Sequence, residues 1–348
     1  MTIPRGARTP TTPRSRVETV LAGKAPDQTP ISFWLHNFAR EQTVDALVAE
    51  TLRLQETFEF DLVKPQSPAH AACLTWGAEV TVPQQPDVWP VLVRPVVRTA
   101  ADLHSIKAMP VSGQLADQIE VLRCLRKSLG PDVPLIGTIF APLMVLWFMH
   151  EGGKPAVLEL VRENPEALTS ALDGIAETLC EFATALVEEA GVDGVFYATT
   201  TCCKGELSER QHELHHAPYD REILAACAGA RMNILHLCGH EIEARRFVEC
   251  EAPIVSWELG GRNPNLIEMH AMFARTMMTG VSGKPAFGTE PVSSLRRQAR
   301  AAIDETGGRN LILAPGCSIN PGVDEARIGA VIDEVRTAET RQDKILPG

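Results

Sequence analysis

Short apolar runs alternate with longer amphipathic stretches along most of the chain. The strand-like runs lie at residues 31–34, 61–65, 135–140, 194–199, 233–238, 254–259, 285–289 and 310–316. The stretches between them, such as TVDALVAETLRLQETF and PEALTSALDGIAETLCEFATALVEEAG, have helical spacing, and the second has Pro165 near its start and Gly191 at its end. Eight strand-helix repeats predict an α/β protein with the (β/α)8 TIM-barrel architecture.

A doubly wound open sheet is the alternative, but no GxGxxG motif follows the first run, and the number of repeats favours a closed barrel. Residues 1–15 are rich in Pro, Thr and Arg and are expected to form a disordered extension. Residues 16–348 are then expected to form one catalytic barrel domain. The least regular part, residues 66–134, is predicted to include an excursion over the barrel mouth.

Charge and composition exclude several classes of partner. The chain of 348 residues has 33 basic and 44 acidic side chains, a net charge of −11, which argues against a broad nucleic-acid-binding face. No apolar run approaches the roughly 18 residues of a membrane helix, so no membrane association is expected. Nine cysteines without a secretory signal indicate reduced thiols and a cytoplasmic location.

The strongest candidate chemistry lies where two of the runs end. His236 and Cys238, in ILHLCGH, are two apart on a strand and therefore face the same way. Cys317, in APGCSINPG, closes the last run at the same rim of the barrel, where TIM-barrel active sites lie. Zinc favours about three such nitrogen and sulfur ligands with one open position. An apolar strand with small buried cysteines is the alternative interpretation.

Other candidates follow from the same rule about strand ends. Glu258 closes the sixth run and is predicted to be catalytic, by completing the zinc sphere or contacting substrate; capping a loop is its alternative role. His36 and Asn37, just beyond the first run, and Tyr197, in the fourth, are candidates for substrate binding.

Several further cysteines and histidines are interpreted as structural. Cys202 and Cys203 are expected in a loop near the pocket, with at most one facing it. The segment ERQHELHHAPYD suggests a metal cluster, but a solvated face is the favoured interpretation of His212, His215 and His216. The cysteines expected to be structural because they lie away from strand ends are Cys73, Cys124, Cys180 and Cys250.

Four segments resemble the uroporphyrinogen decarboxylase superfamily: RVETVLAGKAPDQTPISFW, NPEAL, LHLCG and LAPGCSINPGVDEARIGAVIDEV. Within that superfamily, HxCG followed by a late PGC resembles the zinc-dependent methyltransferase branch, which includes methylcobamide:coenzyme M methyltransferases and corrinoid-linked demethylase partners. The resemblance implies that His236, Cys238 and Cys317 bind Zn²⁺. The decarboxylase's own FMRQAGR segment is replaced by FWLHNFAR, and its FSD by QSP at residues 66–68, which counts against decarboxylation of a tetrapyrrole.

The resemblance therefore implies a zinc-dependent methyl or alkyl transferase that activates a thiol or serves tetrahydrofolate, with a methylated corrinoid protein as donor. No DxHxxG motif is present, so the corrinoid (cobamide) would be carried by a partner protein. The alternatives are a corrinoid-independent zinc enzyme that makes or breaks a C–S bond, a decarboxylase like the parent family, and a non-catalytic accessory protein. The sequence leaves the oligomeric state open.

Overall fold

Six parallel strands form the central sheet of the computed structural model, which describes residues 11–68, 70–284 and 286–339. In the order β3-β4-β5-β6-β7-β8, each strand pairs with the next along the chain. The strands are β3 (Ile136–Phe140), β4 (Gly194–Thr199), β5 (Ile234–Leu237), β6 (Ile254–Trp257), β7 (Thr276–Val281) and β8 (Leu311–Pro315).

Two extended segments close this sheet into a barrel. Ile31 pairs in parallel with Leu313 of β8, and Val63 with Leu135 at the start of β3. The two segments meet where the backbone N–H of Asp61 donates to the carbonyl of Ile31 at 2.9 Å. The first two predicted strands are thus present as short bridges, and the predicted TIM-barrel class is confirmed, as an α/β fold with all its barrel strands parallel.

One predicted strand is wrong. Residues 286–289 form the short helix α11 (Ala286–Thr289), and the seventh strand is β7, ten residues earlier in the chain. The sequence TMMTGV was overlooked because Thr276 and Thr279 interrupt its apolar character. Both threonines are buried, and their hydroxyls donate to the carbonyls of Val20 and Trp257, which removes the cost of burying them.

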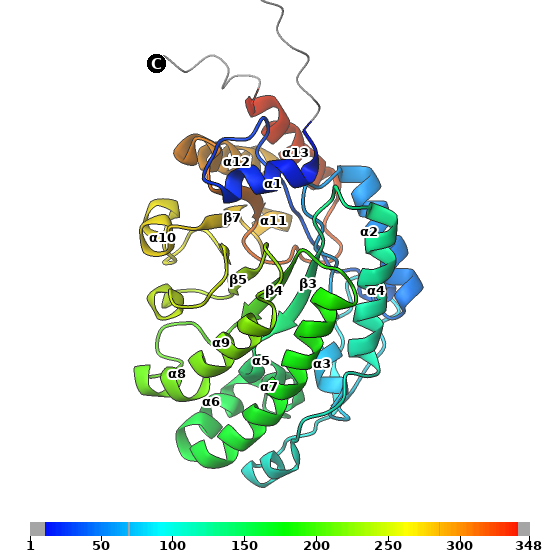
Figure 1. The fold of residues 1–348 in the computed structure, drawn as a ribbon, viewed down its shortest axis with the longest axis vertical. Helices are drawn as coiled ribbons and strands as arrows, with labels where there is room; N and C mark the ends of the chain where they lie inside the picture. The colour runs from blue at the N-terminus through cyan, green and yellow to red at the C-terminus, as the bar shows by residue number, and fades with distance from the viewer. Residues whose placement is uncertain (1–10, 69, 285, 340–348) are drawn as a thin grey trace, which may run out of the picture.

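Helices surround the strands (Figure 1). The major ones are α2 (Val44–Phe58), α4 (Gln114–Leu129), α5 (Pro142–Met149), α6 (Gly153–Glu163), α7 (Pro165–Glu188), α9 (Ala217–Ala226), α10 (Leu266–Phe273), α12 (Val292–Thr306) and α13 (Ala326–Glu339). Shorter ones are α3 (Ala71–Leu74), α8 (Glu209–His215), and the 3-10 turns η1 (Phe38–Arg40), η2 (Ala100–Ser105) and η3 (Ala244–Phe247). Residues 66–134 also hold a small antiparallel hairpin, β1 (Glu79–Val80) and β2 (Leu92–Arg94).

Alternation along the strands divides the core into two layers. On β4, Phe196 and Ala198 point into the barrel, whereas Val195 and Tyr197 pack outward against the helices. The same alternation turns Ile234 of β5 inward and Leu235 outward. The inward layer is the one that carries side chains toward the barrel mouth.

The N-terminal helix α1 (Pro13–Leu21) closes the opposite end of the barrel by inserting Val17 and Val20 into the inward layer. Residues 13–15 were expected in the disordered extension, and the structure corrects this, because Thr12 caps a helix that begins at Pro13. Residues 1–10 lie outside the described part of the chain.

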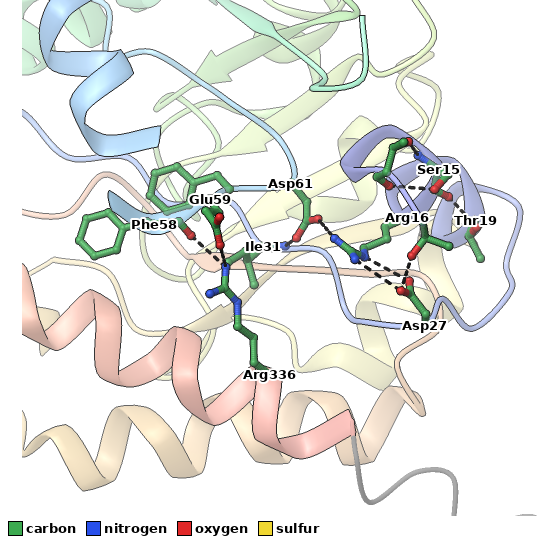
Figure 2. A network of polar contacts seen from close by, with 12 residues as sticks. Ser15, Arg16, Thr19, Asp27, Ile31, Phe58, Glu59, Asp61 and Arg336 are labelled. Atoms are coloured by element: carbon green, nitrogen blue, oxygen red, sulfur yellow. Dashed lines mark hydrogen bonds and ion pairs between the residues drawn. The ribbon is translucent and has the colours of Figure 1, made fainter. Parts of the chain in front are cut away.

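Arg16, on this helix, anchors α1 to the closing segments (Figure 2). Its guanidinium donates to Asp61 at 2.9 Å and to Asp27 at 3.1 Å. The other carboxylate oxygen of Asp61 accepts from the backbone N–H of Ile31 at 3.0 Å. One buried carboxylate therefore joins the helix to both extended segments.

Among the described residues, no helix has the length and apolar character needed to cross a membrane.

Candidate metal centre and active-site cavity

His236, Cys238 and Cys317 converge at the carboxyl ends of the barrel strands. His236 lies on β5, Cys238 directly after it, and Cys317 just beyond β8. The Sγ atoms of the two cysteines are 3.7 Å apart, and one donor atom from each of the three residues lies within 4.8 Å of the others. The close approach of two thiols and an imidazole fits the ligand preference of zinc.

Neighbouring groups orient the imidazole and polarise the thiols. His236 Nδ1 lies 3.1 Å from the Ser256 hydroxyl, which leaves Nε2 for a ligand. The hydrogen bond from Cys238, helped by His236, holds the pKa of the Cys317 thiol well below its usual value. The same sulfur–sulfur contact, together with burial, raises the pKa of Cys238. One thiolate is thus favoured before any metal binds, and metals bind cysteine as thiolate.

The three residues contribute to the wall of a cavity of about 510 Å³. Cys238 and Cys317 are half-buried, and both line this space. The excursion of residues 66–134 contributes Gln66, His70 and Trp89 to the cavity wall, in keeping with its predicted place over the mouth. The aromatic side chains that line the cavity are Trp34, Trp89, Phe140, Trp147, Phe148 and Phe196.

Lys64 is a cavity residue that sequence reasoning missed. It follows the second extended segment and is only 7% exposed. Its Nζ lies 4.7 Å from the ring centroid of Phe196 and 5.4 Å from that of Trp34. Burial lowers the pKa of this ammonium to about 7. The only available signal was a lysine closing an apolar run, DLVKP, at a strand end.

The structure separates the three predicted substrate-binding residues. His36 lines the cavity, and its Nδ1 lies 2.9 Å from the carboxylate of Glu41. Asn37 lies in a smaller adjoining hollow, where its amide donates to Glu50 at 3.3 Å. Tyr197 is fully buried on the outer face of β4 and donates to Asp220 at 2.6 Å. The expectation for Tyr197 is corrected, since strand alternation turns it away from the cavity.

Glu258 lies behind Cys317 and is not among the described side chains that line the cavity. Its carboxylate accepts from the backbone N–H of Gly283 at 2.8 Å, and burial raises its pKa to about 7. A Cβ at Gly316 would lie 2.4 Å from Glu258 Cα, so the chain before Cys317 packs directly on this residue. This placement suits a role exerted through Cys317 better than direct contact with substrate.

The histidines of α8 and the following turn form a buried cluster, which corrects the expected solvated face. His212, His215 and His216 are between 2% and 5% exposed. His216 bonds Asp220 at 2.6 Å and the Thr199 hydroxyl at 2.8 Å, and its ring stacks on that of His212. Packing against Phe247 buries residues that are polar in sequence.

The other cysteines are not among the described residues that line the cavity. Cys202 and Cys203 occupy the loop after β4, where Cys202 Sγ lies 3.6 Å from the Cys238 carbonyl, and neither is among the described residues that line the cavity. The four cysteines expected to be structural also lie outside the described lining; their side chains are buried at Cys73 and Cys250 and half-buried at Cys124 and Cys180.

The fold and the site thus define a TIM-barrel protein with a candidate metal centre at its mouth. The family model of uroporphyrinogen decarboxylase (URO-D) matches residues 12–338. The chain therefore belongs to the uroporphyrinogen decarboxylase family, which confirms the resemblance seen in the sequence.

Individual relatives agree with this assignment. The uroporphyrinogen decarboxylase of Sorangium cellulosum is 27% identical over 257 residues, covering 71% of each chain. That of Syntrophotalea carbinolica is 30% identical over 149 residues, so the match spans 42% of this chain and 43% of that relative.

Two solved structures share the fold. A methyltransferase from Methanosarcina mazei superposes with a TM-score of 0.81 at 18% identity, covering 94% of this chain and 99% of its own. A B12-independent methionine synthase from Shewanella sp. W3-18-1 has a TM-score of 0.52 at 15% identity, covering 91% and 98%. At such identities the likeness shows the fold alone.

Proposed function

We propose that this protein is a zinc-dependent methyl or alkyl transferase that activates a thiol. The observation that carries the proposal is the convergence of His236, Cys238 and Cys317 at the wall of the cavity, which all three residues line. Three nitrogen and sulfur donors leave one position for a substrate sulfur, as in catalytic rather than structural zinc sites. The Methanosarcina protein of similar fold is named a methyltransferase.

Bound zinc would lower the pKa of a substrate thiol and hold it as thiolate in the cavity. The chain's own residues prepare this site. Ser256 fixes the ring of His236, and the low pKa of Cys317 supplies a thiolate. Glu258 accepts from the backbone N–H of Gly283, which packs closely against the backbone of Cys317. In the transfer, the thiol loses its proton to solvent and a new S–C bond forms. The donor's bond to the methyl carbon breaks and leaves its electron pair on the donor.

The proposed donor is a methylated corrinoid carried by a partner protein, with tetrahydrofolate as an alternative acceptor in place of the thiol. The alternative is a corrinoid-independent reaction that makes or breaks a C–S bond. Such a reaction would proceed in an assay without methylcobalamin. Decarboxylation of a porphyrinogen fits the cavity poorly, because a substrate with several carboxylates needs several cations. Among the described residues that line it, Lys64 and Lys284 are the lysines and no arginine is present.

The test is metal analysis combined with a methylation assay on wild type and Cys317→Ala. Wild type should hold close to one zinc per chain and methylate a thiol with methylcobalamin as donor. Cys317→Ala should lose metal and turnover but keep its melting temperature, because the rim metal contributes little to a large core. Cys124→Ala, on α4 outside the described cavity lining, is the matched control. Full activity in metal-free wild type would contradict thiol activation by zinc, and bound zinc without turnover on any thiol, folate or alkyl donor would favour an accessory protein.

A further inference from the structure

Lys64 is a buried lysine that forms no direct ion pair with a described residue, although Glu41 and Cys317 are near enough to favour its charged form. Its ammonium group has neither an ion pair nor a hydrogen bond within that part of the chain and lies instead over the rings of Phe196 and Trp34. A buried charge is costly unless it is paired, and ring faces compensate for only part of its lost hydration. An anionic group on a ligand is the partner that this position lacks.

Uncharged polar atoms at the same cavity also lack partners. Buried atoms without a hydrogen-bond partner include the hydroxyls of Thr138 and Thr200, Gln66 Oε1 and His70 Nδ1, and all four residues line the cavity. Thr138 is the register partner of Phe196, over whose ring Lys64 lies, so a donor hydroxyl and the ammonium both neighbour Phe196. Such clustering indicates a polar ligand, because buried polar groups are normally satisfied.

Aromatic side chains also line the cavity. Trp147 and Phe148 of α5 stack at 4.8 Å with their planes 19° apart, and Phe140 meets Phe148 edge-to-face at 5.8 Å. With Trp34 and Phe196 they line a cavity whose size is typical of a small-molecule site. Flat rings pack well against such walls, in offset-stacked or edge-to-face geometry.

We propose that the acceptor is an aromatic organic acid that carries a thiol. Its acid group pairs with Lys64 and Thr138, its ring packs among Trp34, Trp147 and Phe196, and its sulfur reaches the metal centre. This inference rests on the proposed function, which it deepens by naming the substrate class. A carboxylate and a sulfonate satisfy Lys64 alike, because both present several acceptor oxygens. With few cations at the wall, a single acid group is favoured over a polyacid.

Equilibrium binding to the zinc-loaded protein tests the proposal with three probes. The probes are 4-mercaptobenzoate, thiophenol, which lacks the acid, and 2-mercaptoethanesulfonate, which lacks the ring. We expect 4-mercaptobenzoate to bind most tightly. Lys64→Met should weaken it about tenfold or more, the effect of one hydrogen bond to a charged group, and leave thiophenol unchanged. Lys127→Met, at an exposed site on α4, is the matched control.

Trp147→Leu should weaken both aryl thiols and spare 2-mercaptoethanesulfonate. Thiophenol binding to Lys64→Met shows that this variant is folded. The proposal is overturned if 2-mercaptoethanesulfonate binds more tightly than 4-mercaptobenzoate, if Lys64→Met weakens all three probes equally, or if neither aryl thiol binds.

A sulfur-free probe separates this inference from the proposed function. If 4-methylbenzoate binds in a Lys64-dependent way while the protein holds no zinc and transfers no methyl group, the aryl-acid site stands and the transferase fails. If methyl transfer proceeds equally well to neutral alkyl thiols, the transferase stands and the aryl-acid site fails.

Discussion

Cys238 and Cys317 place their sulfur atoms 3.7 Å apart although 79 positions separate them in sequence. The first follows β5 and the second follows β8, so the contact depends on closure of the barrel rather than on a local loop. A zinc knuckle keeps its ligand pairs close in sequence and organises a short segment. Here the candidate ligands come from separate strand ends, so the barrel and not a short segment brings them together.

The cysteines outside the cavity provide the first prediction. Cys73→Ala and Cys250→Ala should leave zinc content unchanged, because neither side chain is among the described residues that line the cavity. Both are buried, so each substitution should lower the free energy of unfolding by about 1 kcal/mol through lost packing. Metal analysis and urea denaturation measure the two effects separately. Loss of zinc in either variant would place the metal centre elsewhere.

Tyr197→Phe tests the corrected role of that residue. The change removes the hydroxyl that donates to Asp220, which is fully buried. The free energy of unfolding should fall by about 1–3 kcal/mol, the cost of leaving a buried acceptor short of a partner. The KM for substrate should stay at the wild-type value, because the side chain faces the outer helices. A raised KM with unchanged stability would restore the substrate-binding interpretation.

His212 should make stability depend on pH in acid. Burial, reinforced by His216, lowers its pKa to about 4 from 6.5. Between these values the unfolded chain binds more protons than the folded one, so the free energy of unfolding rises as pH rises from about 4 to 6.5. Above 6.5 this contribution is complete, at about 3 kcal/mol as an upper bound. The charged and titratable neighbours of His212 are His216, Asp220, Arg221 and Arg246.

The measurement is urea denaturation at several pH values for wild type and His212→Leu. Each protein gives a slope of unfolding free energy against pH. Only the difference between the two slopes reports on His212, because other groups titrate in the same range. Equal slopes would show that the pKa of this imidazole is the same in the folded and unfolded states.

The barrel was predictable from sequence because most strands are uninterrupted apolar runs bounded by helical stretches. The alternation rule also brought His236 and Cys238 to one face, and Cys317 followed from the strand-end rule. The same alternation rule places Tyr197 outside, since its neighbours Phe196 and Ala198 face inward. The error there lay in choosing a residue by its chemistry rather than by its position on the strand.

Other features depended on packing that the sequence does not display. The sequence of β7 does not indicate a buried strand, because two of its residues are threonines. In the fold, carbonyls from distant segments accept hydrogen bonds from both hydroxyls. Lys64 closes an apolar run, where a lysine ordinarily indicates an exposed end, and the surrounding rings come from several separate elements. The sequence of the histidines after β4 indicates a solvated segment. In the fold, Phe247 of η3 packs against the rings of His212 and His216.

Arg16→Met tests whether α1 is an integral part of the barrel. The change leaves the carboxylate of Asp61, which is 4% exposed, without its cation. Breaking a buried pair from one side should lower the free energy of unfolding by about 3 kcal/mol. Arg94→Met is the control, since its pair with Glu79 is exposed and should contribute less than about 1 kcal/mol. Equal losses measured by urea denaturation would show that the Arg16 network (Figure 2) is not a special anchor.

Gly316→Ala should damage the metal centre without altering a ligand. A Cβ at this position would lie 2.4 Å from Glu258 Cα and 2.5 Å from its Oε2, closer than non-bonded atoms approach. Trp257 is fixed by pairing with β5 and Pro315 by pairing with β7, so relief shifts the short adjoining segments that carry Glu258 and Cys317. Zinc affinity should therefore fall about tenfold or more, the effect of disturbing a metal's supporting shell.

Gly229→Ala is the matched control for this substitution, because its Cβ would meet Val187 at an ordinary 3.5 Å. Competition with a zinc chelator measures the affinity of both variants, and circular dichroism shows whether the barrel remains folded. If Gly316→Ala binds zinc as tightly as wild type, the sulfur atoms do not need their present spacing to hold the metal. The ligand set would then have to include a group other than the pair formed by Cys238 and Cys317.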